Sequence, residues 1–186
     1  MKENPITIGF DDATFDLHSE IKYTQLIGVI CQGTRMVGVI RDKIMIDGDD
    51  ATEKLMKMIK QNEKQVQYII THSITFGGFN LINLAKIYSE IQKPIISITE
   101  REVDIDSVKN ALISKFPNTY RNKLKIIIKA GNLYETELNT AGGISKIFFH
   151  CKGIKIKEVE SLLKKICIDS KLPESVRIAH LIGKTF

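Results

Sequence analysis

The first apolar segment of the chain alternates between apolar and polar positions and predicts a β-strand that ends in two carboxylates. Residues 6–12 read Ile-Thr-Ile-Gly-Phe-Asp-Asp, so that Ile8 and Phe10 point to one side and the odd-numbered residues, Asp11 included, point to the other. Neighbouring like charges in a sheet are costly unless a cation or a hydrogen-bond network compensates them. Two interpretations stay open: a turn in which Asp12 faces solvent, and a metal site that includes Asp11.

The rest of the hydrophobic pattern predicts a hairpin followed by alternating helices and strands. Strands over 24–31 and 36–46 are joined by a turn that contains Gly33, which gives three strands before any helix. Helices over 51–60 and 80–91 then alternate with strands over 66–70 and 94–99. A helix capped by Asp104 or Asp106 follows and stops before Pro117, and strands are predicted over 124–129 and 146–150. The last two predicted helices are one with an apolar face at 159–166 and one with Pro173 at its first position. This order predicts an α/β fold with a mixed sheet, antiparallel in its first three strands, and with helices on both faces.

Three aspartates precede the first predicted helix. Asp50 is placed to be its N-cap, and Glu53 three residues later would complete a capping box. One of Asp47 or Asp49 would then be free to face the same pocket as Asp11.

The composition indicates one globular domain over residues 1–186, with 43% hydrophobic and 26% charged residues. No apolar run approaches the roughly 20 residues that cross a bilayer, and residues 1–4 lack the pattern of a signal peptide. We therefore expect a cytoplasmic protein that does not associate with membranes. The three cysteines are far apart, which argues against a thiolate zinc site or a disulfide framework.

The net charge of +5 is distributed unevenly along the chain. Residues 1–114 contain 13 basic and 16 acidic side chains, whereas residues 115–186 contain 14 and 6. This distribution suits a carboxylate pocket beside a surface that binds polyanions, and it suits solvated helix faces nearly as well.

Several polar residues follow predicted strands, where α/β proteins build their sites. Asp11 and His72 each come directly after a predicted central strand, and Asp47 ends a hairpin strand. Converging carboxylates suit Mg²⁺ or Mn²⁺, which can orient a water and stabilise the charge of a phosphodiester. The alternative for His72 is a structural histidine that is hydrogen-bonded at a strand end.

Other candidate motifs are weaker. Gly77 and Gly78 could cradle a phosphate, but the Lys-Ser/Thr of a Walker loop is missing, so a backbone turn is the simpler interpretation. No Gly-x-Ser-x-Gly motif is present, and His18 and His150 have no convincing neighbours in the predicted arrangement.

Four segments in this order carry a resemblance to a known family. They are Ile-Gly-Phe-Asp-Asp at 8–12, Asp-Gly-Asp-Asp-Ala-Thr-Glu at 47–53, Ile-Thr-Phe-Gly-Gly-Phe-Asn at 74–80 and Leu-Pro-Glu-Ser-Val-Arg-Ile-Ala-His-Leu at 172–181. Together they resemble the uncharacterised archaeal family known as domain of unknown function ninety-nine. That family is similar to endonuclease V, which has a ribonuclease H-like fold and carries a closely similar final run.

The resemblance implies a set of site residues. Endonuclease V uses Mg²⁺, held by acidic residues, to cut a nucleic-acid strand near a deaminated purine. Its first-strand aspartate corresponds to Asp11, and its glutamate after the third strand falls near Asp47 or Asp50. Its aspartate after the fourth strand corresponds to His72, and the residue of its final helix to His180. Arg177 of the final motif joins the glycine pair of 77–78 as a candidate for substrate contact.

The chain departs from its relatives at two places. His72-Ser73 stands where relatives usually have Asp-Gly, which favours Mn²⁺ or Zn²⁺ over Mg²⁺ or else removes catalysis. The Pro-Tyr-Ile-Pro wedge of endonuclease V has no counterpart, since residues 43–46 read Lys-Ile-Met-Ile. The leading hypothesis is a metal-dependent nucleic-acid phosphodiesterase that uses Mg²⁺ or Mn²⁺. The alternatives are a nucleic-acid-binding module without catalysis and, more remotely, a protein scaffold.

Overall fold

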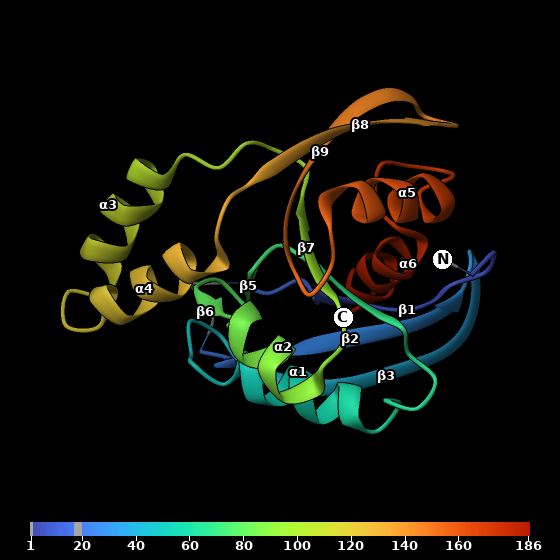
Figure 1. Ribbon diagram of the computed structural model, residues 1–186. Helices are drawn as coiled ribbons and strands as arrows, with labels where there is room; N and C mark the ends of the chain where they lie inside the picture. Colours follow the sequence, from blue (N-terminus) through green and yellow to red (C-terminus); the bar gives the residue numbers. More distant parts are fainter. Residues whose placement is uncertain (1, 17–19) are drawn as a thin grey trace.

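A seven-stranded mixed sheet forms the centre of the structure, a computed structural model that describes residues 2–16 and 20–186 (Figure 1). The strand order is β3-β2-β1-β4-β7-β9-β8. The strands are β1 (Ile6–Asp12), β2 (Tyr23–Gln32), β3 (Arg35–Met45), β4 (Tyr68–His72), β7 (Ile95–Thr99), β8 (Tyr134–Thr140) and β9 (Gly143–Lys152). His18 lies outside the described residues.

Only the middle of the sheet is parallel. β1, β4 and β7 run in the same direction, whereas the β2–β3 and β8–β9 hairpins pair antiparallel to them on either side. The mixed sheet with three antiparallel strands first is therefore confirmed. The parallel strands bring their carboxyl ends, at Asp12, His72 and Thr99, to one edge of the sheet.

Helices cover both faces of the sheet, as predicted. α1 (Ala51–Lys60) and α2 (Leu84–Ile91) pack against Ile8, Phe10 and Ile69 on one face. α5 (Ile156–Ile166) and α6 (Glu174–Gly183) cover the other face, where Ile70 and Ile98 are buried. The alternation of β1 is confirmed, because its even-numbered residues enter the first core and its odd-numbered residues face α6.

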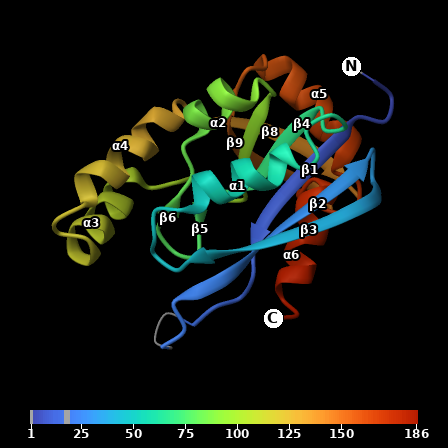
Figure 2. The same cartoon turned by 90° about the horizontal axis from the view of Figure 1, so that it is seen from below.

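A helical hairpin of α3 (Ile105–Lys115) and α4 (Tyr120–Ala130) follows β7 and is set apart from the sheet (Figures 1 and 2). Lys123 fastens it to the body. The buried ammonium of Lys123 donates to the carbonyl oxygens of Gly48 and Phe79, each at 2.9 Å, and pairs with Asp49 at 2.7 Å. A buried ammonium needs such a full set of acceptors. The hairpin is thus held against the β3–α1 turn.

Two of the predicted elements are wrong. Residues 124–129 form part of α4 and not a strand, because Lys123, Ile127 and Ala130 are buried at helical spacing. The predicted helix over 80–91 begins only at Leu84, where the Asn83 side chain caps it by accepting from the Lys86 N–H. The residues before it form the short β5 (Thr75–Phe76) and β6 (Asn80–Leu81) pair. β8 had no predicted counterpart.

Two expected caps also differ. Asp50 stands at the N-cap of α1 but makes no side-chain cap; its Oδ1 accepts from the Asn80 amide at 2.6 Å and the Met45 N–H at 3.1 Å instead. Pro173 is the N-cap of α6 and not its first helical residue. Asp104 caps α3 as predicted, by accepting from the Asp106 and Ser107 N–H groups.

Two glutamines at helix C-caps give a test of backbone strain. Gln92, after α2, has a φ of 55°, whereas Gln61, after α1, has a φ of −63°, and both are exposed. Glycine adopts a positive φ without the steric penalty of a Cβ atom. At a negative φ it has no such advantage, and it loses more backbone entropy on folding than other residues do. We expect Gln92→Gly to raise the free energy of unfolding by about 0.5–1 kcal/mol and Gln61→Gly to lower it by a similar amount. Urea unfolding of both variants checks this, and equal signs would contradict it.

Candidate functional site

Helix α6 lies unusually close to β1, and this contact sets the geometry of the site. A Cβ at Gly9 would lie 2.5 Å from the backbone of Ser175 and Val176, so only glycine fits there. Near the other end of α6, a Cβ at Gly183 would lie 2.7 Å from the Asp12 carbonyl oxygen. The buried Thr7 hydroxyl donates to the Ser175 hydroxyl at 3.1 Å. The helix is therefore fixed along the strand at several points.

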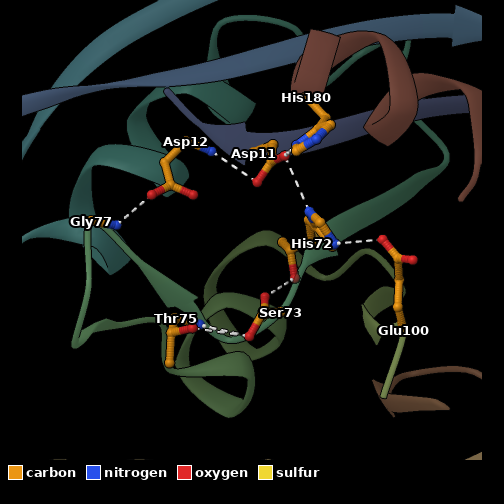
Figure 3. Close-up of polar contacts among 9 residues, drawn as sticks. Asp11, Asp12, His72, Ser73, Thr75, Gly77, Glu100 and His180 are labelled. Atoms are coloured by element: carbon orange, nitrogen blue, oxygen red, sulfur yellow. Dashed lines mark hydrogen bonds and ion pairs between the residues drawn. The ribbon is translucent and has the colours of Figure 1, made fainter. Parts of the chain in front are cut away.

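Three side chains from three elements converge at the end of the strands. Figure 3 shows Asp11 from β1, His72 from β4 and His180 from α6 pointing toward one another. Oδ2 of Asp11 lies 3.1 Å from Nδ1 of His72 and 2.7 Å from Nδ1 of His180. Asp11 is only 4% exposed, so this carboxylate depends on its two imidazole partners. The expected convergence of these three residues is present.

Asp12 is a second carboxylate of the site. Its Oδ2 accepts the Gly77 N–H at 2.8 Å, and its own N–H donates to Oδ1 of Asp11 at 3.0 Å (Figure 3). Burial, with the neighbouring charge of Asp11, raises the pKa of Asp12 from 3.8 to about 6. Asp12 does not simply face solvent, as one of the two interpretations assumed.

Glu100, just after β7, extends the network beyond His72. Its carboxylate lies 3.6 Å from Nε2 of His72 and 3.0 Å from Nζ of Lys171. Burial by itself would lower the pKa of His72, but the hydrogen bond to Asp11 and the surrounding carboxylates raise it. Burial is the main cause of the shift at Asp12 and neighbouring carboxylates are the cause at His72, and both groups hold their protons more tightly than usual.

An open pocket of about 330 Å³ gives access to this group. Its lining consists of Asp11, Asp12, Ala13, Thr14, Phe15, His72, Ser73, Thr75, His180 and Lys184. It therefore combines two carboxylates and two imidazoles with one ammonium.

The structure does not bring Asp47 or Asp50 into the converging group. Oδ1 of Asp47 accepts the Phe79 N–H at 2.9 Å, and its Oδ2 pairs with Lys115 at 2.5 Å. Asp50 is bound to Asn80 and to the backbone of Met45. Asp47 therefore holds the turn between β5 and β6, and Asp50 joins the end of β3 to the Asn80 side chain in β6.

The predicted substrate contacts are also engaged within the protein. The Gly77 N–H is bonded to Asp12, and both Gly77 and Gly78 have positive φ, which fits the backbone-turn interpretation. Arg177 forms two hydrogen bonds with Glu174, at 2.8 and 2.6 Å, and lies 3.6 Å from Asp169. Arg177 does not line the pocket of Asp11.

The chemistry of the donor set fits a divalent cation. Asp11, His72 and His180 each offer one ligand atom, and these atoms lie within 4.8 Å of one another. One carboxylate with two imidazoles suits Mn²⁺, Zn²⁺ or Fe²⁺ better than Mg²⁺, which prefers oxygen ligands. Ser73 has a φ of 73°, a conformation natural to glycine, which agrees with the expected correspondence of His72-Ser73 to an Asp-Gly pair.

Comparison with solved structures identifies the fold class of this protein. The fold is that of endonuclease V: the Ciona intestinalis enzyme, in complex with a 24mer DNA containing an inosine, superposes with a TM-score of 0.59 over 95% of this chain and 83% of the other, at 12% identity. A crystal structure of a protein of unknown function from Archaeoglobus fulgidus gives a TM-score of 0.82 at 29% identity, with 96% of each chain covered. The expected ribonuclease H-like fold is thus confirmed.

The family follows from the sequence comparison. The profile of the Endonuclease dU family matches residues 6–186, and the chain belongs to this family. A UPF0215 protein of Nanoarchaeum equitans is 34% identical over 186 residues, covering 99% of this chain and 89% of the relative. Within the described residues, no helix is both long and apolar enough to span a bilayer.

Sequence reasoning missed Glu100 as a neighbour of the site. The signal was present, because Glu100 follows a predicted parallel strand as Asp11 and His72 do. Its contact with His72 depends on the order β1-β4-β7 in the sheet, which the chain order does not state.

Gly9→Ala tests the contact between α6 and β1. We expect it to lower the free energy of unfolding by about 1–3 kcal/mol, because the new Cβ must push the backbone of Ser175 away. Gly38→Ala in β3 is the matched control, since its Cβ would meet Ile30 at an ordinary 3.5 Å. Chemical unfolding of both variants gives the comparison. Equal effects would show that the close approach carries no special cost.

Asp12→Asn tests the cost of burying the Asp12 charge beside Asp11. The folded pKa of about 6 lies above 3.8, so ionisation of Asp12 destabilises the fold as pH rises from about 4 through 6. In metal-free buffer at pH 7.5, we expect the variant to be more stable by about 1–2 kcal/mol, since the amide oxygen can still accept from Gly77. The gain should vanish below pH 4 in unfolding curves measured across this range.

The control carboxylate for this prediction is Asp42. Despite some burial, hydrogen bonds from the Lys43 N–H and from Lys54 and Lys57 lower the pKa of Asp42. Asp42→Asn should therefore destabilise the protein near neutral pH. A gain in both variants would contradict the assignment of opposite electrostatic environments.

Proposed function

We propose that this protein is a divalent-metal-dependent endonuclease that cuts DNA at deoxyuridine. One observation carries the proposal: Asp11, His72 and His180 converge at an open pocket in a chain of the Endonuclease dU family. The family description supports a strand-cutting activity and this substrate. The DNA-bound endonuclease V of the same fold supports nucleic acid as the partner.

The residues of the pocket have distinct roles in this proposal. Asp11, His72 and His180 would hold the metal ion, with Asp12 beside them to complete the negative charge. A bound divalent ion supplies Lewis acidity toward a phosphodiester and a means to orient water. Lys184 lines the same pocket and offers a positive charge to a phosphate oxygen. Two imidazole ligands favour Mn²⁺ over Mg²⁺.

Negative charge at the pocket must coexist with a polyanionic substrate. The excess of basic residues after position 114 supplies attraction over a wider surface, where 14 basic residues outnumber 6 acidic ones. The local carboxylates are then available to the cation. Within this proposal, the protons that Asp12 and His72 hold more tightly than usual are exchanged for the metal.

The first experiment is a calorimetric titration with Mn²⁺ and Mg²⁺, together with cleavage of an oligonucleotide that contains one deoxyuridine. We expect saturable Mn²⁺ binding and metal-dependent cleavage by the wild type. Asp11→Asn should lose both, with cleavage reduced by at least about a hundredfold. Asp106→Asn, which removes the same charge from an exposed position on α3, is the matched control and should behave as the wild type.

Two further outcomes are informative. If Asp47→Asn or Asp50→Asn, correctly folded by circular dichroism, also abolishes Mn²⁺ binding, the ligand set is wider than the three converging residues. If the wild type binds no metal and cuts nothing, yet binds the oligonucleotide in EDTA with a strong salt dependence, the proposal is overturned in favour of a nucleic-acid-binding module without catalysis.

A further inference from the structure

A second cavity lies beside the metal pocket, between the sheet and the α3–α4 hairpin. Its volume is about 350 Å³, near the lower end of the roughly 300–1,000 Å³ of small-ligand sites. Its walls are largely apolar and are built by Ile74, Phe79, Val103, Ile105, Val108 and Ile127. The cavity therefore suits a flat, largely apolar group of the size of a nucleobase.

This cavity is adjacent to the proposed reaction centre. Ser73 and Thr75 line both the cavity and the pocket of Asp11, so one wall is common to the two. The Ser73 and Thr75 hydroxyls are bonded to each other at 3.0 Å (Figure 3). A nucleotide whose phosphate lies at the metal pocket could thus place its base in the cavity. Enzymes that act at a particular base commonly extrude it from the helix into such a space.

Hydroxyl groups and one imidazole are the polar groups that line the cavity, and the imidazole belongs to His150. Its Nδ1 lies 3.0 Å from the carbonyl oxygen of Asn132. Because a carbonyl can only accept, Nδ1 carries the proton, and in a neutral imidazole Nε2 is then an acceptor. Burial lowers the pKa of His150 and outweighs the opposing effect of the backbone carbonyl groups of Asn132 and Gly131, which favours the neutral ring. Ser97 and Thr99 add hydroxyl groups to the lining.

We propose that this cavity receives the extruded base and that His150 selects a base with a ring N–H, such as uracil, over one with an unprotonated ring nitrogen, such as cytosine. Uracil carries a proton on N3, which Nε2 of His150 can accept, whereas N3 of cytosine is itself an acceptor. Two facing acceptors leave both unpaired, and such sites reject the wrong partner strongly. The Ser97 hydroxyl can donate to a carbonyl oxygen of uracil. This inference rests on the proposed function, because it supplies the base recognition that the function requires.

The test compares binding of two single-stranded oligonucleotides that differ only in one deoxyuridine or deoxycytidine, by fluorescence anisotropy in EDTA. We expect the wild type to bind the deoxyuridine strand about tenfold more tightly. His150→Leu should bring the ratio close to one. His150→Gln should retain part of the preference, because its amide oxygen can still accept the N3 proton. A purely structural role for His150 would not produce this difference between two folded variants.

A second pair of variants tests the cavity itself. Ile105→Trp should fill it and remove the preference for deoxyuridine, since Ile105 is part of its wall and is 47% exposed, so the larger ring can be accommodated. Ile113→Trp on the same helix is the matched control, because Ile113 is 40% exposed and does not line the cavity. It should bind as the wild type does.

The outcomes separate this inference from the proposed function. Metal-dependent cleavage with the deoxyuridine preference intact in both His150→Leu and Ile105→Trp would overturn the cavity assignment and leave the function standing. A wild type without any preference between the two strands would overturn it as well. A preference that His150→Leu and Ile105→Trp abolish, in a protein that cuts nothing, would support the cavity assignment while overturning the proposed activity.

Discussion

The close packing of α6 against β1 is the constraint on which the candidate site depends. Glycine at position 9 lets the helix backbone approach the strand, and Gly183 allows the same near the end of the helix. A helix held at ordinary separation would carry His180 away from the Asp11 carboxylate, which it now meets at 2.7 Å. The site therefore depends on the lack of side chains at positions 9 and 183 as well as on the donor residues themselves.

The hydrogen-bond donors around the site do not fully compensate the negative charge of its carboxylates. Asp11 is buried between two imidazoles, and Asp12 has a pKa of about 6 because its charge is poorly accommodated. Structures retain such unfavourable arrangements when function requires them. The nearby turn shows the opposite solution, since Asp47 is compensated by Lys115 and a backbone N–H. The contrast distinguishes a carboxylate that holds the fold from one that is available to a ligand.

Much of the fold could be predicted from the sequence, because alternation and turn chemistry are local signals. The β1 strand, the hairpin at Gly33 and the helix over 51–60 were confirmed. The run at 124–129 was misassigned, because β-branched isoleucines favour strands, whereas burial of Lys123 against distant carbonyl oxygens fixes a helix. β8 was missed because its residues are mostly polar and partly exposed at the sheet edge.

The candidate site could be predicted only in part. The resemblance and the strand ends indicated the three converging residues, but not how Asp12, Glu100 and the second cavity are arranged around them, since these depend on strand order. One consequence concerns synthesis. Asp11 and His180, whose side chains meet at 2.7 Å, are 169 positions apart in the sequence, and His180 lies in α6. A ribosome must therefore synthesise α6 before the three donor side chains can come together, and a nascent chain that stops before α6 lacks His180.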